Sequence, residues 1–376
     1  MGHHGQPYRP AADERQLWSD AEQEEKKLAK LGNSWDDPLL EEYLSSVAAR
    51  LVPEEAGQAG APAVRIVVLK DPTLNAFSMP NGKVYIHTGL LSRLQNESQL
   101  AMILGHELTH VTNRHALKFN RYALNKQSEV LPSTSNVLLG LGLHLAFIAA
   151  VNGFGRDLER EADREGLERM VAAGYDPREA PRAFELFKDG HGDGSRLENF
   201  LFGKHPQLDE RIASTRELLK AHARPPDASA LTANAEDFAL RTRTVVRENA
   251  ALDIRAGRFG LARGQLDRVL PLAPKDPITH LYFGDLYRLQ AQAGPGRRAR
   301  AKNLADPLLL GLAREAYERA AQLDATFPDP FRQLGLLYYQ SKDPEKAMAA
   351  FRVYLGLKPD APDARRIKEY LVELER

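Results

Sequence analysis

Residues Asn96 to His115 read NESQLAMILGHELTHVTNRH, and apolar side chains recur through this stretch at helical spacing. Asn96 is among the residues preferred at a helix N-cap, and Gln99 stands three residues later, where a capping box places Glu or Gln. The sequence therefore predicts a helix that begins after Asn96. Its apolar face consists of Leu100, Ile103, Leu104, Leu108 and Val111.

This helix carries two histidines and a glutamate at close spacing, in the order His106, Glu107 and His110. The spacing places both imidazoles on one helix face, with Cβ atoms about 6 Å apart, so that both can bind one metal ion. Glu107 then projects beside that ion, where a carboxylate can take a proton from water and return it to a leaving amine. The pattern predicts a zinc site with His106 and His110 as ligands and Glu107 as general base.

A second helix is expected between Gly155 and Ala173, and it contains Glu159 and Asp163 four residues apart. One of these carboxylates can ligate the metal while the other accepts the free ring N–H of a ligand histidine. The alternative is a solvated, charge-rich helix surface with ion pairs four residues apart. We favour the metal site because the histidine-bearing helix precedes it.

A helix from Asp37 to Leu51 and a small β unit are expected before the histidine-bearing helix. Residues 64–69 and 83–88 are rich in β-branched side chains, and the turn residues Pro80-Asn81-Gly82 lie between them, which predicts a hairpin. His87 lies in the second strand, whose edge can add an extended substrate as a further strand.

The composition predicts an ordinary globular protein of two domains, because 376 residues exceed the usual size of one hydrophobic core. Basic and acidic residues are equal in number, 51 of each, so no nucleic-acid partner is expected. The absence of cysteine excludes disulfides, cysteine nucleophiles and thiolate metal ligands.

Two segments bear on whether the chain is exported or contacts a membrane. The residues before Gln58 contain no apolar run with a basic flank, so no signal peptide is expected in this chain. The run VLLGLGLHLAFIAAV, residues 137–151, is shorter than the roughly 20 residues that cross a bilayer. We expect a buried helix there, with peripheral contact to lipid or to an apolar substrate as the alternative.

The sequence PPDAS at residues 225–229 predicts a linker, so the domains are expected to be residues 1–225 and 226–376. Beyond it, Gly335 and Ala347 stand twelve residues apart, and Ala250 and Ala262 repeat that spacing. This pattern resembles the tetratricopeptide unit of about 34 residues. We expect about three repeats, an insertion in the middle one, and a C-terminal capping helix.

Together these motifs resemble the family of zinc peptidases that includes the CaaX prenyl protease and the bacterial β-barrel assembly-enhancing protease, and the repeats make the second branch the nearer one. The resemblance implies an α+β zincin-like (gluzincin) metallopeptidase domain, mostly helical with a small β-sheet, followed by an all-α tetratricopeptide-repeat domain. The matching positions are the HExxH of residues 106–110, Glu159 and Asp163, the segment Asn75-Ala76-Phe77, and His115.

The same resemblance implies one Zn²⁺ ion per chain, with Glu159 as third ligand and Asp163 behind the ligands. It also implies protein or peptide substrates and a periplasmic location in outer-membrane protein quality control. A substrate-binding edge is expected from the strand region, at Asn75, Ala76, Phe77, Val84, Tyr85 and His87.

His205 and Arg211 fall in a segment that resembles one approaching the metal in that family. We hypothesise that His205 is a latch that occupies the fourth position on zinc, or a transition-state contact; a surface histidine is the alternative. Arg211 is expected either to stabilise the oxyanion or to pair with a carboxylate.

The leading hypothesis is thus a zinc endopeptidase whose repeats recruit clients or dock on an outer-membrane assembly machine. One alternative is a chaperone or scaffold with a structural zinc site. A second alternative is a cytosolic peptidase with the same chemistry.

Overall fold

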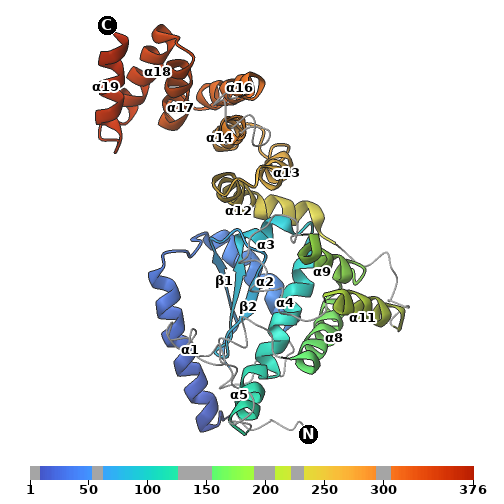
Figure 1. The fold of residues 1–376 in the computed structure, drawn as a ribbon. Helices are drawn as coiled ribbons and strands as arrows, with labels where there is room; N and C mark the ends of the chain where they lie inside the picture. Colours follow the sequence, from blue (N-terminus) through green and yellow to red (C-terminus); the bar gives the residue numbers. More distant parts are fainter. Residues whose placement is uncertain (1–8, 53–61, 126–154, 190–207, 222–232, 294–305) are drawn as a thin grey trace. The chain divides into compact units, whose positions relative to one another are not determined.

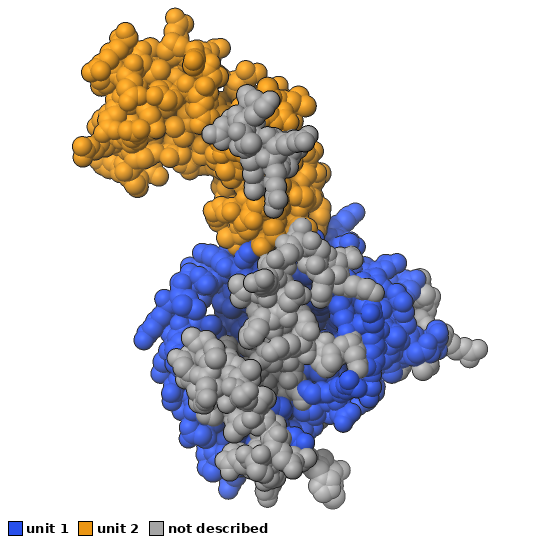
Figure 2. All heavy atoms as spheres, in the orientation of Figure 1, with its two compact units in different colours: residues 1–245 blue, residues 246–376 orange. Residues whose placement is uncertain are grey.

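The computed structural model describes residues 9–52, 62–125, 155–189, 208–221, 233–293 and 306–376. The chain divides into a first unit, residues 1–245, and a second unit, residues 246–376, which Figure 2 colours separately. The expected linker at 225–229, the apolar run 137–151 and His205 lie outside the described residues. Among the helices that the structure describes, none is both long and apolar enough to span a bilayer.

The sheet of the first unit contains β1 (Arg65–Leu69), β2 (Ala76–Ser78) and β3 (Lys83–His87) in the order β1-β3-β2. β1 pairs with β3 in parallel, and β2 pairs with β3 antiparallel. The hairpin prediction was therefore half wrong: the turn through Gly82 joins β3 to β2, not to β1. Gly82 has φ 91°, and a Cβ there would lie 2.7 Å from Ala63 O, so the turn requires glycine.

The expected substrate-adding edge on residues 83–88 was also wrong, because β3 is the central strand and its backbone pairs on both sides. Val84, Tyr85 and His87 therefore offer no open edge. Within the described part of the chain, β2 pairs on one side only, whereas β1 also forms a bridge between Leu69 and Ser34. Among the described residues, β2 is therefore the edge strand opposite β1.

Helices cover both faces of this sheet (Figure 1). α1 (Ala12–Lys30) packs its Ala21 against a cluster that includes Phe77 and Tyr85. α2 (Pro38–Leu51) and α4 (Glu97–Thr112) lie against the opposite face, and the short α3 (Thr88–Arg93) follows β3 directly. α5 (His115–Asn125) continues from α4 after a turn.

The N-terminus of α4 has the predicted N-cap, but the Gln99 side chain bonds to the residue before the N-cap and not to Asn96 N as a capping box requires. The Asn96 side chain accepts from Gln99 N at 2.9 Å, and the Gln99 side chain accepts from Gln95 N at 2.8 Å. Every residue from Glu97 to His110 is buried. α4 is thus the buried central helix of the first unit, and hydrogen bonds anchor its N-terminus.

Glu97, at the start of α4, is buried and accepts hydrogen bonds from several side chains. Its carboxylate accepts from Tyr43 at 2.7 Å, Tyr175 at 2.8 Å, Arg50 at 2.7 Å and Asn234 at 3.0 Å. Burial alone would raise the pKa of Glu97, but these four donors outweigh it and hold the pKa below its ordinary value. The negative charge also suits the positive end of the helix dipole.

Three further helices complete the first unit: α8 (Arg156–Ala172), α9 (Glu179–Asp189) and α11 (Leu208–Ala221). α8 begins after Gly155 and ends before Gly174, as the sequence predicted. α4 and α8 lie side by side in Figure 1 and touch through two glycines. A Cβ on Gly105 would lie 2.9 Å from Gly166 O, and one on Gly166 would lie 2.8 Å from His106 N.

The second unit is entirely helical among the residues described. α12 (Ala235–Arg255) crosses the boundary between the units, and α13 (Phe259–Val269) packs against it through Ala250 and Ala262. The glycine of α14 and that of α17 each face an aromatic ring: Gly284 meets Tyr317 and Gly335 meets Phe351. The remaining helices are α14 (Pro277–Ala293), α16 (Pro307–Leu323), α17 (Pro328–Gln340), α18 (Pro344–Leu357) and α19 (Ala364–Leu374).

Candidate metal centre

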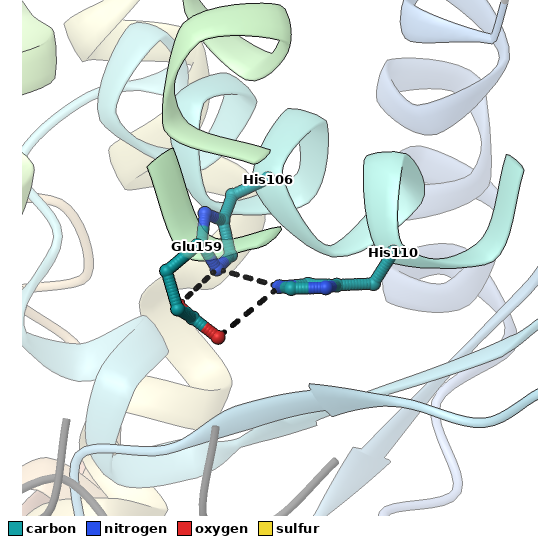
Figure 3. Close-up of side chains that lie close together, drawn as sticks. All are labelled: His106, His110 and Glu159. Carbon is teal, nitrogen blue, oxygen red and sulfur yellow. Dashed lines mark hydrogen bonds and ion pairs between the residues drawn. The ribbon is translucent and has the colours of Figure 1, made fainter. Parts of the chain in front are cut away.

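The structure brings together the three predicted metal ligands. His106 and His110 project from α4, and Glu159 reaches them from the first turn of α8 (Figure 3). His106 Nε2 lies 3.0 Å from His110 Nε2 and 3.5 Å from Glu159 Oε2, while His110 Nε2 lies 3.8 Å from Glu159 Oε1. All three side chains are buried, and their ligand atoms lie within 4.8 Å of one another.

These distances fit a tetrahedral zinc ion. Zinc lies about 2.0 to 2.2 Å from nitrogen and carboxylate ligands, so two ligands on one tetrahedral ion are about 3.3 to 3.5 Å apart. The three observed separations of 3.0, 3.5 and 3.8 Å lie on either side of that value. Two imidazoles and one carboxylate also form a donor set that leaves a fourth position open for catalysis.

Asp163 lies behind the site and orients His106. Its Oδ1 is 2.8 Å from His106 Nδ1, so the ring N–H points to the carboxylate and the Nε2 lone pair faces His110 and Glu159. Burial alone would raise the pKa of Asp163, but the charge of Arg211 and the hydrogen bond from His106 outweigh it, and the pKa lies below its ordinary value. Asp163 is therefore an anion at neutral pH.

Arg211, on α11, holds Asp163 with two hydrogen bonds. Its Nε lies 2.9 Å from Asp163 Oδ2 and its Nη2 lies 2.6 Å from Oδ1. The guanidinium carbon also lies 4.4 Å from the centre of the Phe184 ring, and Nη1 is 3.9 Å from Glu159 Oε2. Of the two roles expected for Arg211, this geometry supports pairing with a carboxylate; the oxyanion role stays a prediction.

Comparison with known proteins agrees with this geometry. Residues 38–219 match peptidase family M48, and residues 310–372 match a tetratricopeptide repeat. The first unit carries an M48 peptidase domain. This match confirms the predicted fold class, a mostly helical metallopeptidase domain with a small sheet followed by repeats.

Several curated proteins resemble the chain. A putative β-barrel assembly-enhancing protease of Vibrio cholerae is 28% identical over 303 residues, which cover 77% of this chain and 58% of that protein. The β-barrel assembly-enhancing protease of Escherichia coli K12 is 32% identical over 197 residues, which cover 48% and 39%. The mitochondrial metalloendopeptidase OMA1 of Arabidopsis thaliana is 35% identical over 153 residues, which cover 39% and 30%. The chain thus spans little more than half of these relatives, or less.

Glu107 follows the first histidine of the M48 motif on α4 and is 9% exposed, compared with 5% for each histidine of the pair. The Glu107 side chain is therefore nearly as buried as the two histidines. A carboxylate so placed can exchange a proton with a water or a substrate atom beside the ligands. Its role as general base stays a prediction.

The predicted substrate segment of the M48 domain lies partly in the edge strand β2. Ala76 and Phe77 belong to β2, and their side chains are buried. Asn75 O accepts from His87 N at 2.9 Å. The His87 ring contacts Thr73 at 2.8 Å, which agrees with a structural role for this histidine.

Sequence reasoning missed Gly105 and Gly166, the residues that set the distance between the two halves of the M48 site. The available signal was one glycine directly before His106 and another seven residues after Glu159. It also missed Phe184, whose ring supports Arg211 from α9. Such a contact between distant helices leaves no local pattern.

Proposed function

We propose that this protein is a zinc-dependent endopeptidase. The observation that carries the proposal is the convergence of His106 and His110 with Glu159, which lies 49 residues after His110 on a different helix. One zinc ion held there would supply Lewis acidity toward a peptide carbonyl. The M48 match and the names of the relatives, proteases and a metalloendopeptidase, support the same reaction.

Glu107 performs the proton transfers of this reaction. Its carboxylate takes a proton from the water whose oxygen bonds to the carbonyl carbon, and it gives that proton to the amine nitrogen as the C–N bond breaks. Glu107 thus ends the cycle in the form in which it began. Asp163, which Arg211 holds in place, keeps His106 in the tautomer that would present Nε2 to the ion.

β2, the edge strand opposite β1 among the described residues, binds the substrate in extended form. Its backbone N–H and C=O groups can pair with a substrate strand. Such pairing recognises the backbone of the substrate more than the side chains of the substrate. This suits an enzyme that acts on unfolded or stalled proteins, whose backbone is exposed. Asn75, Ala76 and Phe77 are the residues of this edge.

The physiological setting that we propose is protein quality control in the periplasm. The support is the name of the relatives, β-barrel assembly-enhancing proteases, and the presence of repeats in the second unit. Repeats of this type present a surface to other proteins, so the second unit recruits clients or an outer-membrane assembly machine. Within this proposal, His205 remains the candidate for a latch on zinc, and His205→Ala is expected to raise the peptidase rate.

The direct test compares casein cleavage by wild type and Glu107→Gln after both have been shown to hold equal zinc. General acid–base catalysis contributes about 10²- to 10⁴-fold, so a fall in kcat of that size is expected. Glu217→Gln is the matched control, because Glu217 lies on α11 and is 69% exposed. Equal rates for wild type and Glu107→Gln would contradict the proposal and favour a scaffold with structural zinc.

A further inference from the structure

The second nitrogen of His110 has a specific neighbour. His110 Nδ1 lies 2.8 Å from Nδ1 of His115, and the two rings meet edge to face with centroids 4.8 Å apart. His115 is fully buried and is the first residue of α5. The preceding residue, Arg114, has φ 56°, a left-handed conformation that turns the chain between α4 and α5.

The contact fixes the proton positions on both rings. Two nitrogens 2.8 Å apart share one hydrogen bond, so one carries the proton and the other offers a lone pair. His110 can bind a metal through Nε2 only when its proton is on Nδ1. His115 Nδ1 must then be the acceptor, and the proton of His115 lies on Nε2.

His115 Nε2 faces α8 and lies 3.5 Å from Glu161 Oε1, which is a charge contact and not a hydrogen bond. The same oxygen accepts from Asn113 Nδ2 at 2.7 Å. Lys118 Nζ is 3.4 Å from it. The carboxylate of Glu161 beside Nε2 favours the His115 tautomer that carries its proton on that nitrogen.

We propose that His115 is a positioning residue for the metal centre: it holds His110 in the tautomer that binds metal. The inference rests on the proposed zinc site. Asp163 contacts His106 directly, whereas His110 contacts His115, whose far nitrogen lies 3.5 Å from the Glu161 carboxylate.

A purely structural role for His115 would require only its volume. The geometry also requires the nitrogen at Nδ1 of His115. An apolar atom in its place would remove this acceptor from the buried His110 N–H, or it would shift the His110 proton from Nδ1 to Nε2. Either outcome weakens metal binding. Loss of such an outer hydrogen bond typically lowers metal affinity about 10- to 100-fold.

The test compares two variants of nearly equal shape in the full chain. His115→Asn keeps an oxygen at the same number of bonds from Cβ as Nδ1, whereas His115→Leu has a methyl group there. Zinc dissociation constants are measured by competition with a chromophoric chelator. His115→Leu is expected to bind zinc about 10- to 100-fold more weakly than wild type, and His115→Asn to recover most of that loss.

His280→Leu is the matched control, because His280 lies in α14 of the second unit and its ring contacts only a backbone oxygen, Pro274 O at 3.1 Å, among the hydrogen bonds of the described residues. It is expected to bind zinc as wild type does. Melting temperatures of the zinc-free proteins show whether Leu and Asn at position 115 fold equally well.

The outcomes separate the inference from the proposed function. If wild type binds no zinc, the proposed function fails. If wild type binds zinc and His115→Leu binds it equally well, or if Leu and Asn lose affinity equally, the positioning role is overturned. Should His115→Leu not fold, Glu161→Leu replaces it, because the Glu161 side chain is 28% exposed. That variant is expected to lose zinc affinity severalfold, and wild-type affinity would overturn the inference.

Discussion

The two units use glycine in the same way but for different purposes. In the first unit Gly166 brings α8 against the backbone of α4, so that a Cβ would lie 2.8 Å from His106 N. In the second unit Gly335 makes room for an aromatic ring, and a Cβ would lie 2.4 Å from Phe351 Cδ1. The first contact joins two backbones, and the second joins a backbone to a side chain.

The chemistry beside the two contacts differs as well. Next to Gly166, the interface of α4 and α8 buries His106, Glu159 and Asp163, whose positions matter to fractions of an ångström for metal binding. Next to Gly335, the interface buries Phe351 and Ala347, which need only fill space. A change of helix spacing should therefore alter metal binding in the first unit and only stability in the second.

The largest expected effect is that of Arg211→Met, which tests whether the buried charges of the first unit depend on one another. Removal of one partner from a buried ion pair costs about 3–5 kcal/mol, because the charge of Asp163 stays buried. Unfolding of the first unit can be followed by tryptophan fluorescence, since both tryptophans, Trp18 and Trp35, lie in it.

Arg216→Met is the matched control on the same helix. Arg216 forms an ion pair with Glu185 in which the side chains are 60% and 40% exposed, so its loss should cost less than about 1 kcal/mol. Equal costs for the two arginine variants would show that the Asp163 pair does not stabilise the first unit more than a surface pair.

The second prediction sets the two glycines against each other. Gly166→Ala places a methyl group against backbone that cannot rotate away, and the overpacking should cost up to about 3 kcal/mol and weaken zinc binding at least tenfold. Gly335→Ala should lower the stability of the second unit but leave zinc affinity and casein cleavage unchanged. Zinc titration and casein assays of both variants check this. Weaker zinc binding by Gly335→Ala, or wild-type binding by Gly166→Ala, would break the comparison.

The smallest expected effect concerns Glu97, which anchors α4 but lies away from the metal ligands. Glu97→Gln should destabilise the first unit by about 1 to 2 kcal/mol at neutral pH, since an amide cannot accept all four donors. Because the folded-state pKa lies below the ordinary 4.5, the carboxylate stabilises the fold above that pH. The stabilisation is lost as the pH falls through the folded-state pKa.

The measurement is the free energy of unfolding from pH 7 to pH 3. The difference between wild type and Glu97→Gln should be constant above about pH 5 and shrink in acid. Glu217→Gln, with a side chain 69% exposed, should show no such difference. A difference that grows in acid would contradict the role given to Glu97.

The local features of the molecule could be predicted from the sequence. Asn96 is the N-cap that the sequence predicted, and the four-residue spacing of His106 and His110 places both rings on one face. Glu159 and Asp163 share a face of α8 for the same geometric reason. Each of these depends on residues within one helical turn.

The features that were missed depend on contacts between distant segments. The parallel pairing of β1 with β3 has no local signal, and β2, with three residues, is too short to show an alternating pattern. The helix from Ala12 to Lys30 was not anticipated, because its sequence is strongly polar with few apolar positions. The close approach of Gly105 to Gly166 and the four donors of Glu97 appear only once the helices are packed.

The central claim is that one zinc ion binds between α4 and α8, and zinc content tests it most directly. The full chain is stripped with a chelator, supplied with excess zinc, desalted and analysed for metal beside Glu159→Gln and a His106→Ala, His110→Ala double variant. One zinc per wild-type chain, less in Glu159→Gln and none in the double variant is the expected result. A wild type without zinc, or a double variant that keeps one zinc per chain, would contradict the claim.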